Sequence, residues 1–217
     1  MLKYRLRRLR FYKHYLVARH RQPEVRALKL FIYRRFRRAF TINAPAVNVE
    51  LSLLKTWQPV GGIWFDAPIV AIVLIDGTPA FGMALEITGK CIRIMQLHGA
   101  RGFSTRGRCR PARLWPQFFV EACQEFANMH DYSQVRVVRS HRSYSWKRPS
   151  TRYDPDTTED IRELQSIRLR LIRRLDGTAG ALGFEQQKNW WIWKAKKQPK
   201  VGPAGWGATR FGVMDNA

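Results

Sequence analysis

A glycine- and arginine-rich segment, GARGFSTRGRCR at residues 99–110, has the composition of an anion-binding loop. Its glycines would let backbone N–H groups approach a ligand, and its arginines would contact phosphate oxygens bidentately. The residues expected to bind are Arg101, Gly102, Arg106, Gly107, Arg108, Arg110 and Arg113. The segment joins a strand-like run to a helical pattern, a junction where free N–H groups and the helix dipole favour an anion. We therefore expect a site for a phosphorylated or otherwise acidic ligand; the alternative is a solvated basic loop.

Four other residues could reach the same edge of a sheet and carry proton transfer there. Glu86 and His98 are candidates for a general base, Tyr144 is a candidate for a general acid, and His141 lies nearby in the sequence. Transfer of an acyl group to an amine needs a base for the amine proton and an acid for the leaving thiolate. The alternative for each residue is structural: a hydrogen-bonded histidine at a strand end, or a surface tyrosine.

The sequence lacks the motifs of several other enzyme classes. It has no nucleophile elbow, no P-loop and no zinc motif. Its three cysteines, Cys91, Cys109 and Cys123, form no C-x-x-C pair and no metal-ligand spacing with the five histidines. We therefore expect no metal site and a reducing compartment. No apolar run approaches the ~18–20 residues of a membrane span, so we expect a cytoplasmic protein, with attachment to the inner membrane face left open.

Positive charge is concentrated near the N-terminus. The 217 residues carry a formal net charge of +23, and residues 1–40 contain 14 Lys and Arg but one acid, Glu24. Two apolar stripes predict one or two helices interrupted at Gln22–Pro23: Leu2, Leu6, Leu9, Tyr12 or Lys13 and Leu16, then Leu28, Phe31, Ile32 and Phe36. We expect a basic helical arm that binds nucleic acid or an anionic membrane surface. The alternative is a helical subdomain on the main body with a solvated basic face.

The elements that would position the candidate residues follow from hydrophobic periodicity. Strands are predicted at 47–54, 69–75, 81–87, 91–97, 134–139 and 189–193, with a hairpin turn at residues 76–79 (Asp-Gly-Thr-Pro). One helix carries Trp115, Phe118, Phe119, Ala122, Phe126 and Met129 at helical spacing. A second begins at a capping box, residues 157–160, has the core stripe Ile161, Leu164, Ile167 or Arg168, Leu171 and Leu175, and ends at Asp176–Gly177. The predicted fold is α/β (α+β), a mixed, mainly antiparallel sheet with packed helices at residues 41–194, before a loosely ordered basic tail at 195–217.

This order of elements resembles the Gcn5-related N-acyltransferase fold, with an anion loop between a strand and a helix and an Ala181-Leu182-Gly183-Phe184 turn before the last strand. The resemblance implies that residues 101–110 hold the pyrophosphate of coenzyme A, with acyl-CoA or acetyl-CoA as co-substrate. The loop departs from the family's Q/R-x-x-G-x-G/A pattern around Gly107, and Ala179 stands where the family has a tyrosine acid. The implied function is an N-acyltransferase-like protein, with the acceptor and the activity left open.

Shorter pieces resemble the bacterial VirK/YbjX-type proteins, whose biochemical role is poorly defined. They are residues 94–99 (IMQLHG), 110–114 (RPARL), 135–138 with His141, and Leu175–Asp176. This resemblance implies a bacterial intracellular or envelope-linked protein and no particular reaction. The other function left open is a non-enzymatic basic protein that binds nucleic acid or an anionic membrane through residues 1–40 and 139–152.

Overall fold

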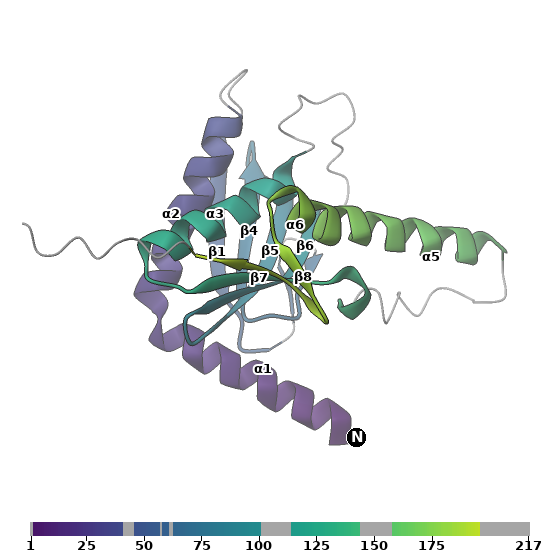
Figure 1. Cartoon of the computed structure of the whole chain (residues 1–217), viewed down its shortest axis with the longest axis horizontal. Helices are drawn as coiled ribbons and strands as arrows, with labels where there is room; N and C mark the ends of the chain where they lie inside the picture. Colours follow the sequence, from purple (N-terminus) through teal and green to yellow (C-terminus); the bar gives the residue numbers. More distant parts are fainter. Residues whose placement is uncertain are drawn as a thin grey trace, which may run out of the picture.

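A mixed seven-stranded sheet with helices on both faces forms the body of the protein (Figure 1). The computed structural model describes residues 2–40, 46–56, 58–60, 63–100, 114–143 and 158–195. The predicted fold class, an α+β protein with a mainly antiparallel sheet, is confirmed.

The sheet has the strand order β1-β4-β5-β6-β7-β9-β8, and β6 and β7 are its one parallel pair of neighbours among the described residues. Its strands are β1 (Val47–Leu53), β4 (Ile69–Ile75), β5 (Thr78–Thr88), β6 (Cys91–Gly99), β7 (Gln134–Val138), β8 (Glu185–Gln187) and β9 (Trp190–Lys194). A separate short hairpin consists of β2 (Pro59–Val60) and β3 (Ile63–Trp64). All the strands predicted from the sequence are present, with ends shifted by a few residues. β8 was not predicted, because its three residues are polar and exposed.

The β4–β5 turn is shorter than predicted. Asp76 and Gly77 have φ of 51° and 74°, so they alone form the left-handed two-residue turn, and β5 already begins at Thr78. The carboxylate of Asp76 also accepts a 2.9 Å hydrogen bond from the amide of Ala46. This bond connects the turn to the start of β1.

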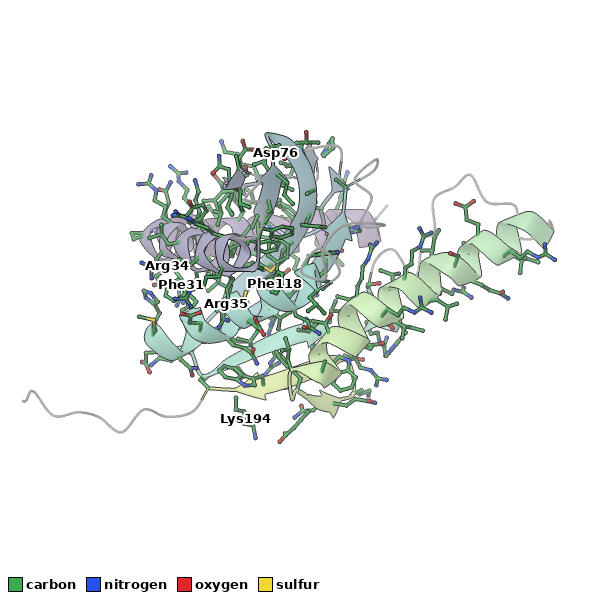
Figure 2. All side chains as sticks on the ribbon, turned by 90° about the horizontal axis from the view of Figure 1, so that it is seen from above. Phe31, Arg34, Arg35, Asp76, Phe118 and Lys194 are labelled. Atoms are coloured by element: carbon green, nitrogen blue, oxygen red, sulfur yellow. The ribbon has the colours of Figure 1, made fainter. Side chains whose placement is uncertain are left out.

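Helices α2 (Gln22–Ala39) and α3 (Trp115–Met129) cover one face of the sheet and pack against each other. The predicted apolar stripe of α2 is confirmed, because Leu28, Phe31, Ile32 and Phe36 are all buried in the main core. At the rim of this interface, Arg35 of α2, labelled in Figure 2, pairs with Glu121 and Glu125 of α3 at 3.5 and 3.2 Å.

Helix α1 (Leu2–His20) does not pack on the sheet through the apolar stripe predicted for residues 2–16. The residues that it buries are Phe11, His14, Tyr15 and Ala18, whereas Leu6, Leu9, Tyr12 and Leu16 are exposed. Phe11 packs with Phe65, Val70 and Ile72 in a second apolar cluster on the sheet face opposite α2 and α3. The helix has apolar residues on two sides, and the side with the larger rings faces the sheet.

The last helical segment is longer than predicted. Helix α5 (Thr158–Leu171) continues through a π-helical turn, η3 (Ile172–Asp176), into α6 (Gly177–Ala181). The predicted stop at Asp176–Gly177 is wrong, because Gly177 has a helical φ of −64°; the left-handed residue is Gly183, with φ of 73°. The predicted core stripe is buried only at Leu171 and Leu175, because the first part of α5 projects away from the sheet (Figures 1 and 2).

Candidate anion-binding site

The sheet opens between the two parallel strands. Only residues Cys91–Ile94 of β6 pair with β7, opposite residues Gln134–Val137, although β6 continues to Gly99. The pairing stops at a β-bulge, where Leu85 of β5 lies opposite Ile94 and Ala84 lies opposite Gln96, so that Met95 is the extra residue. The opening lies at the carboxyl ends of two parallel strands, the usual place for a ligand in such sheets.

The π-helical turn η3 lies at this opening, in contact with β6 and with the short 3₁₀ helix η2 (Ser140–Arg142) that follows β7. The carboxylate of Asp176 anchors it by accepting hydrogen bonds from the amide of Ser140 at 3.1 Å, the hydroxyl of Ser140 at 2.5 Å and the indole N–H of Trp191 at 2.7 Å. Asp176 therefore fixes η3 to the end of β7 and to β9.

Arg174 of η3 lies between the end of β6 and the start of α3. Its guanidinium is 5.7 Å from the ring centroid of Trp115, and one terminal nitrogen is 3.8 Å from the position that a Cβ would take at Gly99. Burial, and secondarily the charge of Arg170, lower the pKa of Arg174. Within the described residues no carboxylate forms an ion pair with Arg174, so this half-buried cation has no counter-ion there.

A cavity of about 440 Å³ lies beside Arg174. One wall is the first turn of α3, residues 114–117, and the other is formed by Arg170, Arg173, Arg174 and Thr178. The first turn of α3 contains no acidic residue and no side-chain cap. Pro116 has no N–H and the amide of Gln117 donates to the carbonyl of Leu114 at 2.9 Å, so this turn offers an anion mainly the positive end of the helix dipole. Three guanidinium groups and a helix N-terminus therefore surround one cavity, which favours a ligand with several negative charges.

Described residues at the two ends of the segment predicted to bind phosphate lie at this cavity. Gly99 lies beside Arg174, and Leu114 is part of the cavity wall. The predicted phosphate ligands themselves lie outside the described residues: Arg101, Gly102, Arg106, Gly107, Arg108, Arg110 and Arg113. Tyr144, the candidate acid, also lies outside them.

His98 is partly buried at the edge of the site. Its ring meets the ring of Phe65 edge-on, with centroids 6.0 Å apart. Burial, and secondarily the charge of Arg174, lower its pKa to about 4. The imidazole is therefore neutral at neutral pH, where it can accept a proton but is a weak base.

Glu86 is not brought to the cavity. On β5, Glu86 lies opposite Arg93, whereas the residue opposite His98 is Gly82. Four strand residues span roughly 13 Å, so Glu86 is about that far along the sheet from His98. Its carboxylate is buried under α1, 3.6 Å from Nε2 of His14 and 3.9 Å from Arg93. Burial is the main cause that lowers the pKa of His14, so Arg93 is the lasting positive partner of Glu86. These contacts connect α1 to the sheet.

The cavity also contains residues that the sequence did not single out. They are Arg170, Arg173 and Arg174, near the end of a helix that was expected to stop at Asp176–Gly177. The signal that could have revealed them is RLIRRLDGT at 170–178, in which basic residues precede a small-residue turn. Ala179, at the position of the tyrosine acid in the resembling family, is buried in the main core and supplies no hydroxyl.

The described residues contain no group of three or more His, Cys, Asp or Glu side chains placed to hold a metal ion. None of the helices in the described part of the chain is both long enough and apolar enough to cross a membrane. No protein-family model and no curated protein sequence matches this chain.

Proposed function

We propose that the cavity between α3 and η3 binds the phosphate groups of an acyl-CoA-type ligand, and that the protein is N-acyltransferase-like. The observation that carries the proposal is Arg174, a half-buried guanidinium with no carboxylate partner among the described residues, facing Trp115 and Gly99 beside the cavity. A buried charge without a partner is costly, and a bound phosphate would remove that cost.

The rest of the cavity supports a ligand with more than one phosphate group. Arg170 and Arg173 add two charged forks, each suited to bidentate contact with phosphate oxygens. The α3 N-terminus adds the positive end of a helix dipole. The volume of about 440 Å³ lies within the range of small-molecule sites, roughly 300–1,000 Å³.

The split between β6 and β7 supports an extended ligand. Beyond Ile94, the β7-facing backbone of residues 95–99 has no strand partner in the described part of the sheet. An extended chain with amide groups could hydrogen-bond to such an edge as an added strand does. A coenzyme A ligand has both parts, a diphosphate for the arginines and an amide-containing arm for the strand edge.

The acyl acceptor stays open in this proposal. His98 precedes Gly99 on β6, lies near enough to Arg174 for that charge to lower its pKa, and is neutral at pH 7, so it can take the proton of an amine acceptor, whereas Glu86 is held under α1. A second, non-enzymatic candidate function is binding of a polyanion through residues 1–40, which the exposed basic residues of α1 favour. For either function we propose a cytoplasmic location, with contact to the inner membrane face as the further possibility.

The proposal can be tested by thermal unfolding of the full chain with coenzyme A, acetyl-CoA and pantetheine, which lacks the phosphates. At a hundred times its dissociation constant, a ligand adds about 2.7 kcal/mol to the free energy of unfolding. Coenzyme A and acetyl-CoA should stabilise the protein, pantetheine should not, and Arg170→Gln with Arg174→Gln should abolish the effect. Arg26→Gln with Arg34→Gln, at two exposed positions of α2, is the charge-matched control. Equal stabilisation of the double variant, or none of the wild type at low salt, would refute the proposal.

A further inference from the structure

Helix α1 has two apolar faces on opposite sides. Phe11, His14, Tyr15 and Ala18 are buried against the body, and Leu6, Leu9, Tyr12 and Leu16 face away from it. At about 100° per residue, the exposed group spans an arc of about 120°, centred about 170° from the buried group. The protein therefore uses one face of the helix, and no described residue covers the other.

The exposed side chains form a continuous stripe rather than isolated contacts. Their exposed fractions are 58% for Leu6, 65% for Leu9, 47% for Tyr12 and 37% for Leu16. From Leu6 to Leu16 the stripe runs about 15 Å along the helix axis. Single exposed leucines are ordinary on a protein surface, but an apolar stripe of this length with a polar rim marks an interaction surface.

Basic residues surround the stripe. Arg5 and Lys13 lie within its arc, Arg8 and Arg19 flank it on one side, and Arg10 flanks it on the other; all five are exposed. Residues 2–20 contain no acidic side chain. A cavity of about 530 Å³ continues the surface from Leu9 and Tyr12 to Lys55 and Thr56 of the body. Long basic side chains of this kind can reach phosphate groups while apolar neighbours insert more deeply.

This combination favours one kind of anionic partner. The arginines alone would suit any phosphate backbone, but leucines at positions 6, 9 and 16 gain nothing from the backbone of a nucleic acid. A helix that lies in a membrane interface needs both, an apolar stripe among the acyl chains and basic residues at the lipid headgroups. We infer that the face of α1 formed by Leu6, Leu9, Tyr12 and Leu16 docks on an anionic lipid membrane, with the helix axis parallel to the surface.

The body of the protein holds this face in place before any membrane contact. Phe11 packs in the cluster with Phe65 and Ile72, and His14 lies 3.6 Å from Glu86 of β5. Docking therefore requires no folding of α1, unlike that of a helix that orders only on lipid. The inference rests on α1 alone and does not depend on the cavity beside Arg174.

Flotation of the full chain with phosphatidylcholine vesicles, with and without phosphatidylserine, tests the inference. Binding should require phosphatidylserine and weaken with salt. The triple variant Leu6→Gln, Leu9→Gln, Leu16→Gln keeps every charge and should lower partitioning by about tenfold or more. Leu30→Gln with Leu169→Gln and Met129→Gln, three apolar residues 54%, 54% and 64% exposed on other helices, is the matched control and should bind as the wild type.

Two further readouts make the test decisive. The melting temperature of the triple variant should match that of the wild type, because the three leucines are exposed; loss of binding with an unchanged melting temperature supports membrane docking. Wild-type partitioning by the triple variant would overturn the inference. So would a preference of the wild type for single- or double-stranded DNA over the vesicles at equal salt, because the surface would then be a nucleic-acid interface.

Discussion

The guanidinium of Arg174 lies over the indole of Trp115, 5.7 Å from its ring centroid, and Trp115 stacks in turn on Phe81 with 4.9 Å between centroids. Arg174 of η3, Trp115 at the start of α3 and Phe81 of β5 therefore contact one another in succession. The arginine that faces the cavity is supported from below by the core.

Replacing Trp115 by alanine should therefore weaken both stability and ligand binding. Truncating a buried aromatic residue costs about 3–5 kcal/mol, and Arg174 would lose the ring that supports it. Urea unfolding measures the first effect, and a coenzyme A titration at a temperature where the variant is still folded measures the second. Trp115→Phe keeps a ring under the guanidinium, so it should retain most of the binding; equal losses in the two variants would argue against a role for the stacking.

Glu86→Gln should lower the free energy of unfolding by about 1–3 kcal/mol, because it leaves Arg93 without its buried carboxylate. The same change should leave the affinity for coenzyme A unaltered, since Glu86 lies under α1 and away from the cavity. Chemical denaturation and a ligand titration on one preparation separate the two effects. A folded, fully stable variant that had lost an acyl-transfer activity would instead make Glu86 the catalytic base.

The protein should lose stability as the pH falls from about 6.5 towards about 4, in part because of His98. Its pKa of about 4 lies below the ordinary value of 6.5, so the unfolded chain takes up the proton first and is favoured on acidification. The contribution is fully present above about pH 6.5. Denaturation at a series of pH values should show a shallower slope for His98→Gln than for the wild type. The pKa of His14 is also lowered, so His14 adds to the same pH dependence. Because the wild type and the His98→Gln variant both contain His14, the difference between their slopes reports His98 alone.

Gly82→Ala should destabilise the protein by about 1–3 kcal/mol, as overpacking does. A Cβ at this position would lie 2.7 Å from the ring of Phe65 and 3.1 Å from Cδ1 of Ile72, and Phe65 is itself buried. Gly180→Ala in α6 is the matched control, because a Cβ there meets nothing within 4 Å. The control should be neutral or slightly stabilising, and differential scanning calorimetry of the two variants gives the comparison. Equal melting temperatures would show that Phe65 moves freely.

Most of the sheet could be predicted from local sequence. The β-branched run at Ile69–Ile75 and the Asp76–Gly77 turn fix a hairpin with little help from the rest of the chain. The stripe of α2 was equally readable, because its opposite face is almost entirely basic. In α1 the pattern was ambiguous, since apolar residues occupy two sides and only tertiary contact decides that Phe11, and not Leu9, is buried.

The candidate site was only half readable from sequence. The glycines and arginines of residues 99–110 indicated an anion near the start of a helix. The three arginines of the opposite wall come about sixty residues later, and two of them, Arg173 and Arg174, lie in a π-helical turn that periodicity does not reveal. Asp176 was read as a helix stop, whereas its carboxylate holds that turn to Ser140 and Trp191.

The extra residue at Met95 decides which side of the sheet each later residue of β6 occupies. Side chains alternate along a strand, so one inserted residue reverses the alternation beyond it. Ile94 and Leu97, three residues apart, therefore both point into the main core, and His98 lies beside Phe65 on the opposite side. If residues 94–99 ran as a regular strand with Met95 paired and no bulge, His98 would lie on the same side as Ile94, and Gly99 would turn away from Arg174. The parity of a single strand thus determines on which side of the sheet this chain places a titratable group.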